Sequence, residues 1–353
     1  MTRITLLLLA VSVLAACSQS QTAPAADHAH SPYTCVHETD HLPAIESQAN
    51  QLYRYGKYLE NQLSSSSGYV TLDRFTKIAR YYRLAAAYGD YRANLALMDL
   101  LYKVNDDGYD NVSTPWRKQR EDESARLLRQ LVAENIPAGF DRLGGFASQE
   151  WNLPAALSYY RKAADLGNPH AQFEAAEMLN PSTIIGMTAK ATREDAKVAD
   201  SLYRCAAEQG YGDAISTIGR ALLQDGKRDE AILVFHRGIA KGDVGSASAL
   251  EDLFAQLQKS SKGTSADAER VRRYEAIRVF LIDHRNAGVT LPDVEKIVPL
   301  PPARLPAWNG TFQWAFDNET ANANPPDKPS EQVVQRLSRD KHLDPHTGLP
   351  LAQ

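Results

Sequence analysis

One motif recurs along the middle of the chain, and it constrains the fold more than any other feature of the sequence. A full copy begins with an aromatic residue. Two alanines follow three and four positions later, a glycine follows seven positions after the aromatic residue, and a further alanine stands four positions after the glycine. Three copies fit closely, at residues 82–93, 160–171 and 203–214, and two fit weakly. The turn positions of the five copies are Gly89, Asn135, Gly167, Gly210 and Gly242.

Pairs of packed helices explain this motif. A glycine just past a helix end adopts a positive φ without the steric cost of a β-carbon. The alanines on either side of the turn let two antiparallel helices approach closely, and the aromatic side chain fills the space against the neighbouring pair. A single pair cannot bury its apolar face alone, so such repeats stack. The sequence therefore predicts an all-α protein, an α-solenoid of antiparallel helical hairpins.

The copies resemble Sel-one-like repeats (SLR), which are relatives of tetratricopeptide repeats. The resemblance covers roughly residues 50–255 and implies an extended surface that binds another protein. Two spacings between turn positions, of 46 and 43 residues against 32 for the others, imply insertions at 105–120 and 180–195. These loops either belong to a binding surface or are simply solvated, and both interpretations stay open. The adjacent glycines Gly144 and Gly145 are interpreted as a helix break.

The first residues have the pattern of a secretion signal. Arg3 precedes an apolar run, Ile4–Ala16, which is short of the roughly 20 residues that a membrane-spanning helix needs. The run ends in Leu-Ala-Ala-Cys, which resembles the lipobox of bacterial lipoproteins. The resemblance implies that residues 1–16 are a signal peptide and that Cys17 carries lipid. Because Ser18 and not aspartate follows, it also implies a periplasmic protein anchored in the outer membrane. A secreted protein with a chance cysteine is the alternative.

Residues 17–34 are polar and poor in helix-forming residues, so we expect them to form a flexible tether between the lipid and the fold. The repeat array is then expected over residues 35–260. If Cys17 is lipidated, Cys35 and Cys205 remain in an oxidising compartment. They either form a disulfide or are buried separately as thiols, because the sequence does not tell whether their Cα atoms come within about 7 Å.

His37, Glu38 and His41 match the pattern H-E-x-x-H, which on a helix places two zinc-binding imidazoles on one face with a glutamate base beside them. The surroundings argue against a helix, because Asp40 lies inside the motif and Pro43 follows it closely. We therefore expect no catalytic metal and no other cofactor. A zinc-binding protein that uses these two histidines and the glutamate is kept as an alternative.

The composition changes after about residue 260, and we expect residues 261–353 to form a helix and then a proline-rich region that caps the array. The helix, 266–284, has apolar residues at helical spacing, and its arginines are interpreted as a solvated face. Four aromatic residues after the prolines are expected to be buried in the cap. A short last helix begins after Ser330, its expected N-cap. The arginines are Arg270, Arg272, Arg273 and Arg278, and the aromatic residues are Trp308, Phe312, Trp314 and Phe316.

The chain has 39 Lys and Arg residues against 43 Asp and Glu, which argues against a nucleic-acid partner. The sequence has no nucleophile elbow, glycine-rich phosphate loop or repeated acidic ligand pattern, so we expect a protein that is not an enzyme.

Four segments near the ends of the mature chain resemble those of a family of proteobacterial repeat lipoproteins. Some proteins similar to this family are encoded beside type VI secretion phospholipase effectors of the phospholipase D class and act as the periplasmic immunity proteins of those effectors. The resemblance implies a protein partner, namely such a phospholipase, and it assigns no contact residues. A scaffold for envelope protein complexes is the alternative function. The segments are residues 34–38, 296–302, 308–314 and 343–350.

Overall fold

The computed structural model describes residues 26–62, 71–103, 114–188, 190–259, 264–285 and 288–351. The chain divides into two compact units. Unit 1 consists of the described parts of Leu42–Arg142 and Ala321–Gln353, and unit 2 of those of Ala23–His41 and Leu143–Thr320. The predicted signal peptide and Cys17 lie outside the described residues. Within the described ranges, no helix has the length and apolar character needed to cross a membrane.

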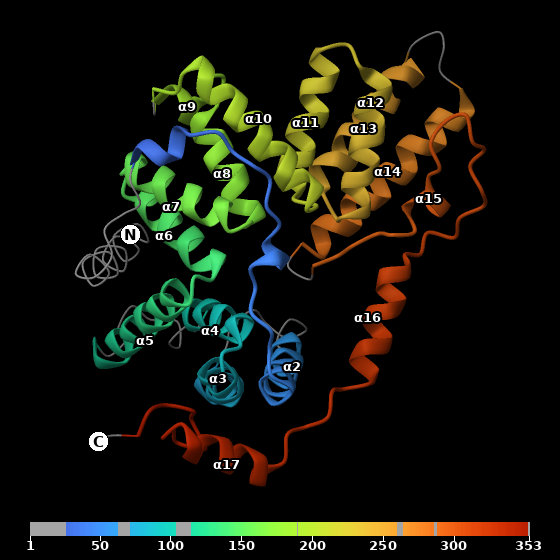
Figure 1. The fold of residues 1–353 in the computed structure, drawn as a ribbon. Helices are drawn as coiled ribbons and strands as arrows, with labels where there is room; N and C mark the ends of the chain where they lie inside the picture. Colours follow the sequence, from blue (N-terminus) through green and yellow to red (C-terminus); the bar gives the residue numbers. More distant parts are fainter. Residues whose placement is uncertain are drawn as a thin grey trace. The chain divides into compact units, whose positions relative to one another are not determined.

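The described residues are largely helical, and some of the connections between the helices are long and extended (Figure 1). The helices of unit 1 are α2 (Ser47–Asn61), α3 (Leu72–Ala87), α4 (Tyr91–Lys103), α5 (Thr114–Ala133) and α17 (Glu331–Asp340). Those of unit 2 are the 3-10 helices η1 (Ala26–His30) and η2 (Glu38–Asp40), and the α-helices α7 (Leu153–Asp165), α8 (Pro169–Leu179), α9 (Ile184–Thr188), α10 (Arg193–Glu208), α11 (Gly212–Gln224), α12 (Arg228–Ala240), α13 (Val244–Lys259), α14 (Ser265–Asp283) and α15 (Val294–Ile297). The residues of α6 (Pro137–Gln149) and α16 (Gln313–Ala323) belong in part to each unit.

Consecutive helices pack as hairpins in both units, for example α3 on α4 and α7 on α8. The prediction of an all-α array of antiparallel helical hairpins is confirmed. Each turn position lies in a three-residue turn between two helices. The residue after it donates its N–H to the carbonyl oxygen of the residue five positions before itself; Asn168, for example, donates to Ala163 at 3.0 Å. Such bonds close a helix end that needs a positive φ. The φ of the turn positions ranges from 53° at Asn135 to 91° at Gly167.

In three copies of the motif, the aromatic side chain packs on a glycine of the preceding helix. The pairs are Tyr82 on Gly56, Tyr160 on Gly144 and Phe235 on Gly219. A β-carbon at any of these glycines would lie within 2.9 Å of the facing ring, so the helices could not come as close. Gly144 and Gly145 both lie inside α6, and their interpretation as a helix break is therefore wrong.

The proline-rich region does not form one cap together with the rest of the C-terminal residues. Its part up to residue 320 belongs to unit 2, where Phe312 is buried in a core formed with α12, α13 and α14. Trp308 and Trp314 are partly buried against that core. Phe316 is 66% exposed, so the expectation that it is buried is wrong. The last residues, from 321 on, belong to unit 1.

The arginines of α14 do not all lie on a solvated face. Arg270 and Arg273 are buried, which corrects the interpretation from the sequence. Arg273 donates to the carbonyl oxygens of Ile297 and Pro306 at 2.6 and 2.7 Å, and Arg270 donates to that of Ala303 at 3.0 Å. The three accepting residues lie at the end of α15 and in the proline-rich stretch after it, where carbonyl oxygens need such donors when they are buried.

The end of the chain is fastened to α3 in unit 1. Arg83 is buried and donates to both carboxylate oxygens of Glu123 at 2.7 and 2.8 Å, and to the carbonyl oxygen of Thr347 at 2.7 Å. The backbone turns at Gly348, where a β-carbon would lie 2.8 Å from the Arg83 side chain. The prediction that Ser330 caps the last helix is confirmed, because its hydroxyl accepts from the N–H of Val333.

Candidate functional site: the amino-terminal segment and exposed surfaces

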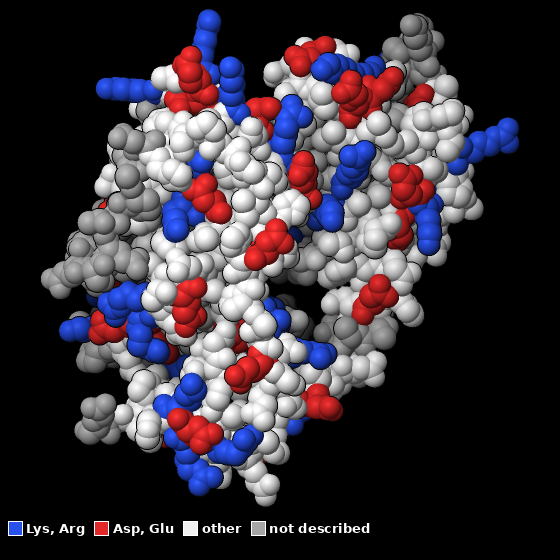
Figure 2. Space-filling view, viewed as in Figure 1, with Lys and Arg blue, Asp and Glu red and all other residues white. Residues whose placement is uncertain are grey.

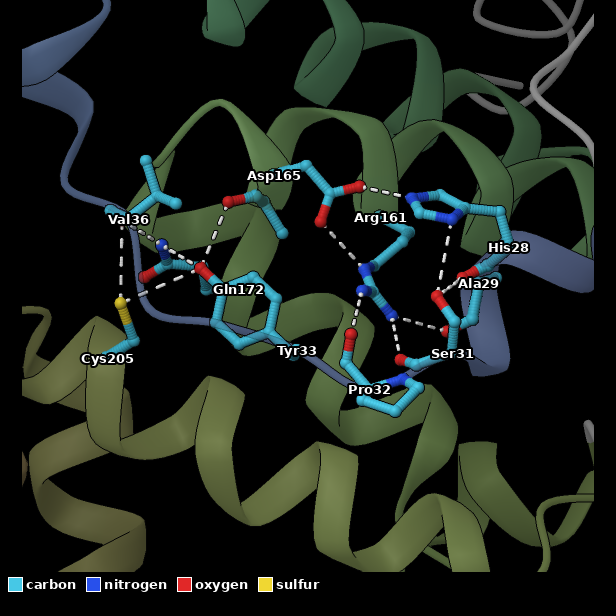
Figure 3. A network of polar contacts seen from close by, with 11 residues as sticks. His28, Ala29, Ser31, Pro32, Tyr33, Val36, Arg161, Asp165, Gln172 and Cys205 are labelled. Carbon is cyan, nitrogen blue, oxygen red and sulfur yellow. Dashed lines mark hydrogen bonds and ion pairs between the residues drawn. The ribbon is translucent and has the colours of Figure 1, made fainter.

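Residues 26–41, here called the amino-terminal segment, are fixed to unit 2 by polar side chains of α7, α8 and α10 (Figure 3). The sequence predicts a flexible tether over residues 17–34. For residues 26–34 this prediction is wrong, because they are held against the helices of unit 2. Ala29 is 2% exposed and its carbonyl oxygen accepts a hydrogen bond from α7. The rest of the predicted tether, residues 17–25, lies outside the described residues.

Arg161 of α7 is the main contact of this segment. Its Nη1 donates to the carbonyl oxygens of Ala29 and Ser31 at 2.9 and 2.8 Å, and its Nη2 donates to that of Pro32 at 3.1 Å. The guanidinium carbon lies 5.3 Å from the centre of the Tyr33 ring. Arg161 is only 2% exposed, so these carbonyl oxygens replace the water that the cation has lost. The planar fork of arginine suits it to hold several acceptors in a fixed arrangement.

Two glutamines continue the network toward α8 and α10. Gln172 donates to the hydroxyl of Tyr33 at 2.8 Å and to the carbonyl oxygen of Val36 at 2.9 Å. Gln209 donates to the side chain of Gln172 and accepts from the backbone N–H of Glu38. Burial raises the pKa of Tyr33 to about 12, so the phenol keeps its proton at neutral pH.

A disulfide joins Cys35 of the segment to Cys205 of α10, with Cα atoms 5.4 Å apart. Of the two arrangements that the sequence leaves open, the structure has the disulfide. The segment also passes directly over Gly167, where a β-carbon would collide with the backbone of His37 and Glu38. Glycine at this turn position therefore serves the helix end and also makes room for the segment.

His30 connects the segment to the start of α10. Its Nδ1 lies 2.7 Å from Oδ1 of the buried Asp195, while Oδ2 of Asp195 accepts from the backbone N–H and the hydroxyl of Thr192. Burial alone would raise the pKa of Asp195. The hydrogen bonds from His30 and Thr192 outweigh burial, and the pKa is lowered.

We expect the protein to lose stability in acid as Asp195 takes up a proton. The pKa of this carboxyl is lower in the folded protein than its value of about 3.9 in an unfolded chain. Its stabilising effect is therefore complete above the unfolded value and is lost as the pH falls through the folded one. The urea midpoint should fall less between about pH 5 and pH 2 in Asp195→Asn, which has no carboxyl group to titrate there. Equal falls in both proteins would contradict this assignment.

Within the described ranges, one group of three ligand atoms from His, Cys, Asp or Glu lies close enough together for a metal, and it consists of Cys35, His37 and Cys205. The two cysteines are joined to each other, so neither supplies a thiolate. Glu38 lies in the 3-10 helix η2 and not in an α-helix, and neither it nor His41 belongs to the group. The alternative of a zinc site built from the H-E-x-x-H residues is therefore not supported.

Arg161 was not predicted from the sequence, although a signal for it exists. In all five copies of the motif the residue six positions before the turn position is basic, and we call this residue the basic position. A cation that a helical motif buries must find acceptors, and main-chain carbonyl oxygens outside the helices are the available ones. The basic position is occupied by Arg83, Arg129, Arg161, Arg204 and His236.

The short helix α9 presents exposed apolar side chains and comes from the predicted insertion at 180–195. Ile184 is 78% and Met187 is 62% exposed. The backbone beneath them is well held, because the N–H of Gly186 donates to the Thr183 hydroxyl and its carbonyl oxygen accepts from Ala191. A rigid, exposed apolar surface is a typical protein contact. On the face shown in Figure 2, basic and acidic side chains are interspersed among uncharged residues, without a large area of one sign.

The comparisons with known proteins bear on the C-terminal region and on the fold. Residues 246–351 match a domain of unknown function, DUF6396. Comparison with curated protein sequences gives no match.

Two solved structures of immunity proteins from Pseudomonas aeruginosa resemble the chain over most of its length. Immunity protein Pa5087 is matched with a TM-score of 0.53, and immunity protein PA5088 with 0.54. Each is 21% identical, over 77% of this chain and 95% of that one. The chain shares its fold with these two immunity proteins. The structure of c5321, a protective antigen of uropathogenic Escherichia coli that displays an SLR fold, is matched with a TM-score of 0.43, which is too low for a comparison of architecture.

Proposed function

We propose that this chain is a lipid-anchored periplasmic immunity protein, which binds and neutralises a phospholipase effector of type VI secretion without performing a reaction itself. The observation that carries the proposal is the fold that it shares with two immunity proteins, over 95% of each. The lipobox-like sequence at Cys17 supports the outer-membrane anchor, and the resemblance to repeat lipoproteins supports the target. Helical repeats present surfaces for binding another protein, which suits stoichiometric inhibition.

Co-expression with a phospholipase D-class effector encoded beside this chain tests the target. The chain should co-purify with the effector and should relieve the toxicity of the effector when the latter is directed to the periplasm. Failure of both would contradict the proposed function. If the chain instead retains envelope partners in cells that contain no such effector, the scaffold function is favoured.

The anchor is tested separately with Cys17→Ser. The unaltered chain should carry acyl chains on Cys17 and fractionate with outer membranes, and the variant should not be acylated. Detection of unmodified Cys17 in the mature protein would contradict the anchor without affecting the proposed partner.

The exposed side chains of α9 are expected to contribute to effector binding. Exchanging both Ile184 and Met187 for serine should weaken binding about tenfold or more, because burying an apolar side chain contributes about 1.5–3 kcal/mol. Calorimetric titration with the effector measures the change. The matched control is Leu233→Ser, since Leu233 is also an exposed apolar residue of unit 2 but lies on α12. Equal affinity of the α9 variant and the unaltered chain would exclude α9 from the interface.

A further inference from the structure

Three of the five basic positions hold a segment that lies outside the repeat helices. Arg83 donates to the carbonyl oxygen of Thr347 at 2.7 Å, and Arg161 donates to three carbonyl oxygens of the amino-terminal segment. His236 is buried, and its Nε2 lies 2.9 Å from the carbonyl oxygen of Val298. In each case a buried cation or imidazole of the motif faces a main-chain carbonyl group. The repeats thus have a common way of binding segments that run across them.

The other two basic positions, Arg129 and Arg204, are exposed. Arg204 pairs with Asp200 on its own helix, with Nε and Oδ2 2.9 Å apart. Arg129 instead lines a pocket of about 350 Å³ on α5 in unit 1. The pocket is also lined by Leu349 and Pro350, which directly follow the segment that Arg83 holds.

Two carboxylates, those of Asp122 and Glu123, line the pocket together with Arg129, and among the described residues no hydrogen bond or ion pair engages the side chain of Arg129. Glu123, which also lines the pocket, is engaged by Arg83 at 2.7 and 2.8 Å and lies 3.6 Å from Arg126. The pocket shares two features with the positions of Arg83 and Arg161, namely a guanidinium group at the same motif position and a non-helical segment beside it, although Arg129 is exposed where those two arginines are buried.

We propose that Arg129 binds a main-chain carbonyl group of an extended segment of the protein partner, which lies in this pocket beside Leu349 and Pro350. The inference rests on the proposed function, since the partner is the effector. An extended segment is the occupant because a helix uses its carbonyl groups internally and has none to offer along its length. The three occupied positions agree with this argument. The carbonyl groups that they bind lie at helix ends or in turns and loops, and not inside helices.

The test measures the affinity of the full chain for the effector that it co-purifies with. Arg129→Ala should weaken binding about 10- to 100-fold, the effect of losing a hydrogen bond from a charged group. Arg204→Ala is the matched control, because Arg204 has the same motif position and is also exposed but lies outside the pocket. The affinity of this variant for the effector should change less than about twofold. Both variants should keep the urea midpoint of the unaltered chain. Unchanged affinity of Arg129→Ala in a chain that binds the effector overturns the inference, whereas no binding by the unaltered chain overturns the proposed function.

Two further readouts identify the group that Arg129 binds. A photo-reactive phenylalanine analogue at Gln119, which lines the pocket, should cross-link to one continuous segment of the effector, and a synthetic peptide of that segment should bind the unaltered chain. The ratio between the affinities of the unaltered chain and Arg129→Ala should stay nearly constant as salt is raised, because a carbonyl group carries no net charge. A ratio that collapses at high salt, or cross-links to a helix of the effector, would overturn the assignment of an extended main-chain segment.

Discussion

Replacing Arg161 by alanine is expected to lower the free energy of unfolding by about 3 kcal/mol or more, because a hydrogen bond from a charged group contributes about 1.5–3 kcal/mol and Arg161 donates several. The variant leaves the carbonyl oxygens of the buried Ala29 and the half-buried Ser31 without their donor, and an unpaired buried acceptor costs about 1–3 kcal/mol. Urea unfolding measures the loss. Cleavage after Tyr33 by chymotrypsin in native conditions should also become faster, because the amino-terminal segment then detaches more often.

Arg204→Ala is the control for this prediction as well. It removes the same side chain at the same position of the motif, but at the surface, so the free energy of unfolding should change by less than about 0.5 kcal/mol. If both variants lose the same stability, the contacts of Arg161 with the amino-terminal segment are not the cause. Arg161→Lys should restore only part of the loss, because an ammonium group lacks the planar fork that faces three carbonyl oxygens.

Removal of the disulfide is expected to have an effect of similar size. Cys35 and Cys205 are 170 residues apart in the sequence, and cross-linking a loop of that length removes entropy from the unfolded chain worth about 5 kcal/mol. The double variant Cys35→Ala and Cys205→Ala should therefore unfold at a clearly lower urea concentration than the oxidised chain.

Adding a reductant provides the matching comparison. It should lower the stability of the unaltered chain toward that of the alanine variant and leave the variant unchanged. Because Arg161 and the disulfide hold the same segment, their losses should be less than additive when combined. Full additivity would show that the two fastenings act on independent parts of unit 2.

The repeat motif made the hairpins predictable from sequence, since the glycines, alanines and aromatic residues act within a few residues of one another. Gly167 is one example, where the local requirement for a positive φ is visible in the sequence. Its second role, making room for His37 and Glu38, depends on a contact between residues 130 positions apart, and no local pattern contains it. Gly144 was misinterpreted for the same reason. Glycine is needed there because the ring of Tyr160 on the next helix packs directly against it.

The buried arginines were the largest failure of prediction. Arg270 and Arg273 occur among polar residues on α14, and charged side chains in such places are usually solvated. Their burial follows from the proline-rich backbone that covers them, whose carbonyl oxygens they bind. For the candidate site, the sequence indicated that Cys35 and Cys205 could pair. It did not indicate that Arg161 and Gln172 hold the amino-terminal segment. The recurrence of the basic position marks Arg161 in the sequence, but the carbonyl groups that it binds are distant, and no local pattern contains them.

The fixed amino-terminal segment also limits how far the protein can stand from a membrane. In a chain anchored through Cys17, only the nine peptide steps to Ala26 separate the lipid from the fold, a reach of at most about 30 Å. A tether that continued to Cys35 would have had about twice that reach. If the proposed anchor and partner both hold, a captured effector would therefore be kept within the shorter of these distances from the membrane that carries the anchor. The effector would then be blocked in place and not carried away from that membrane.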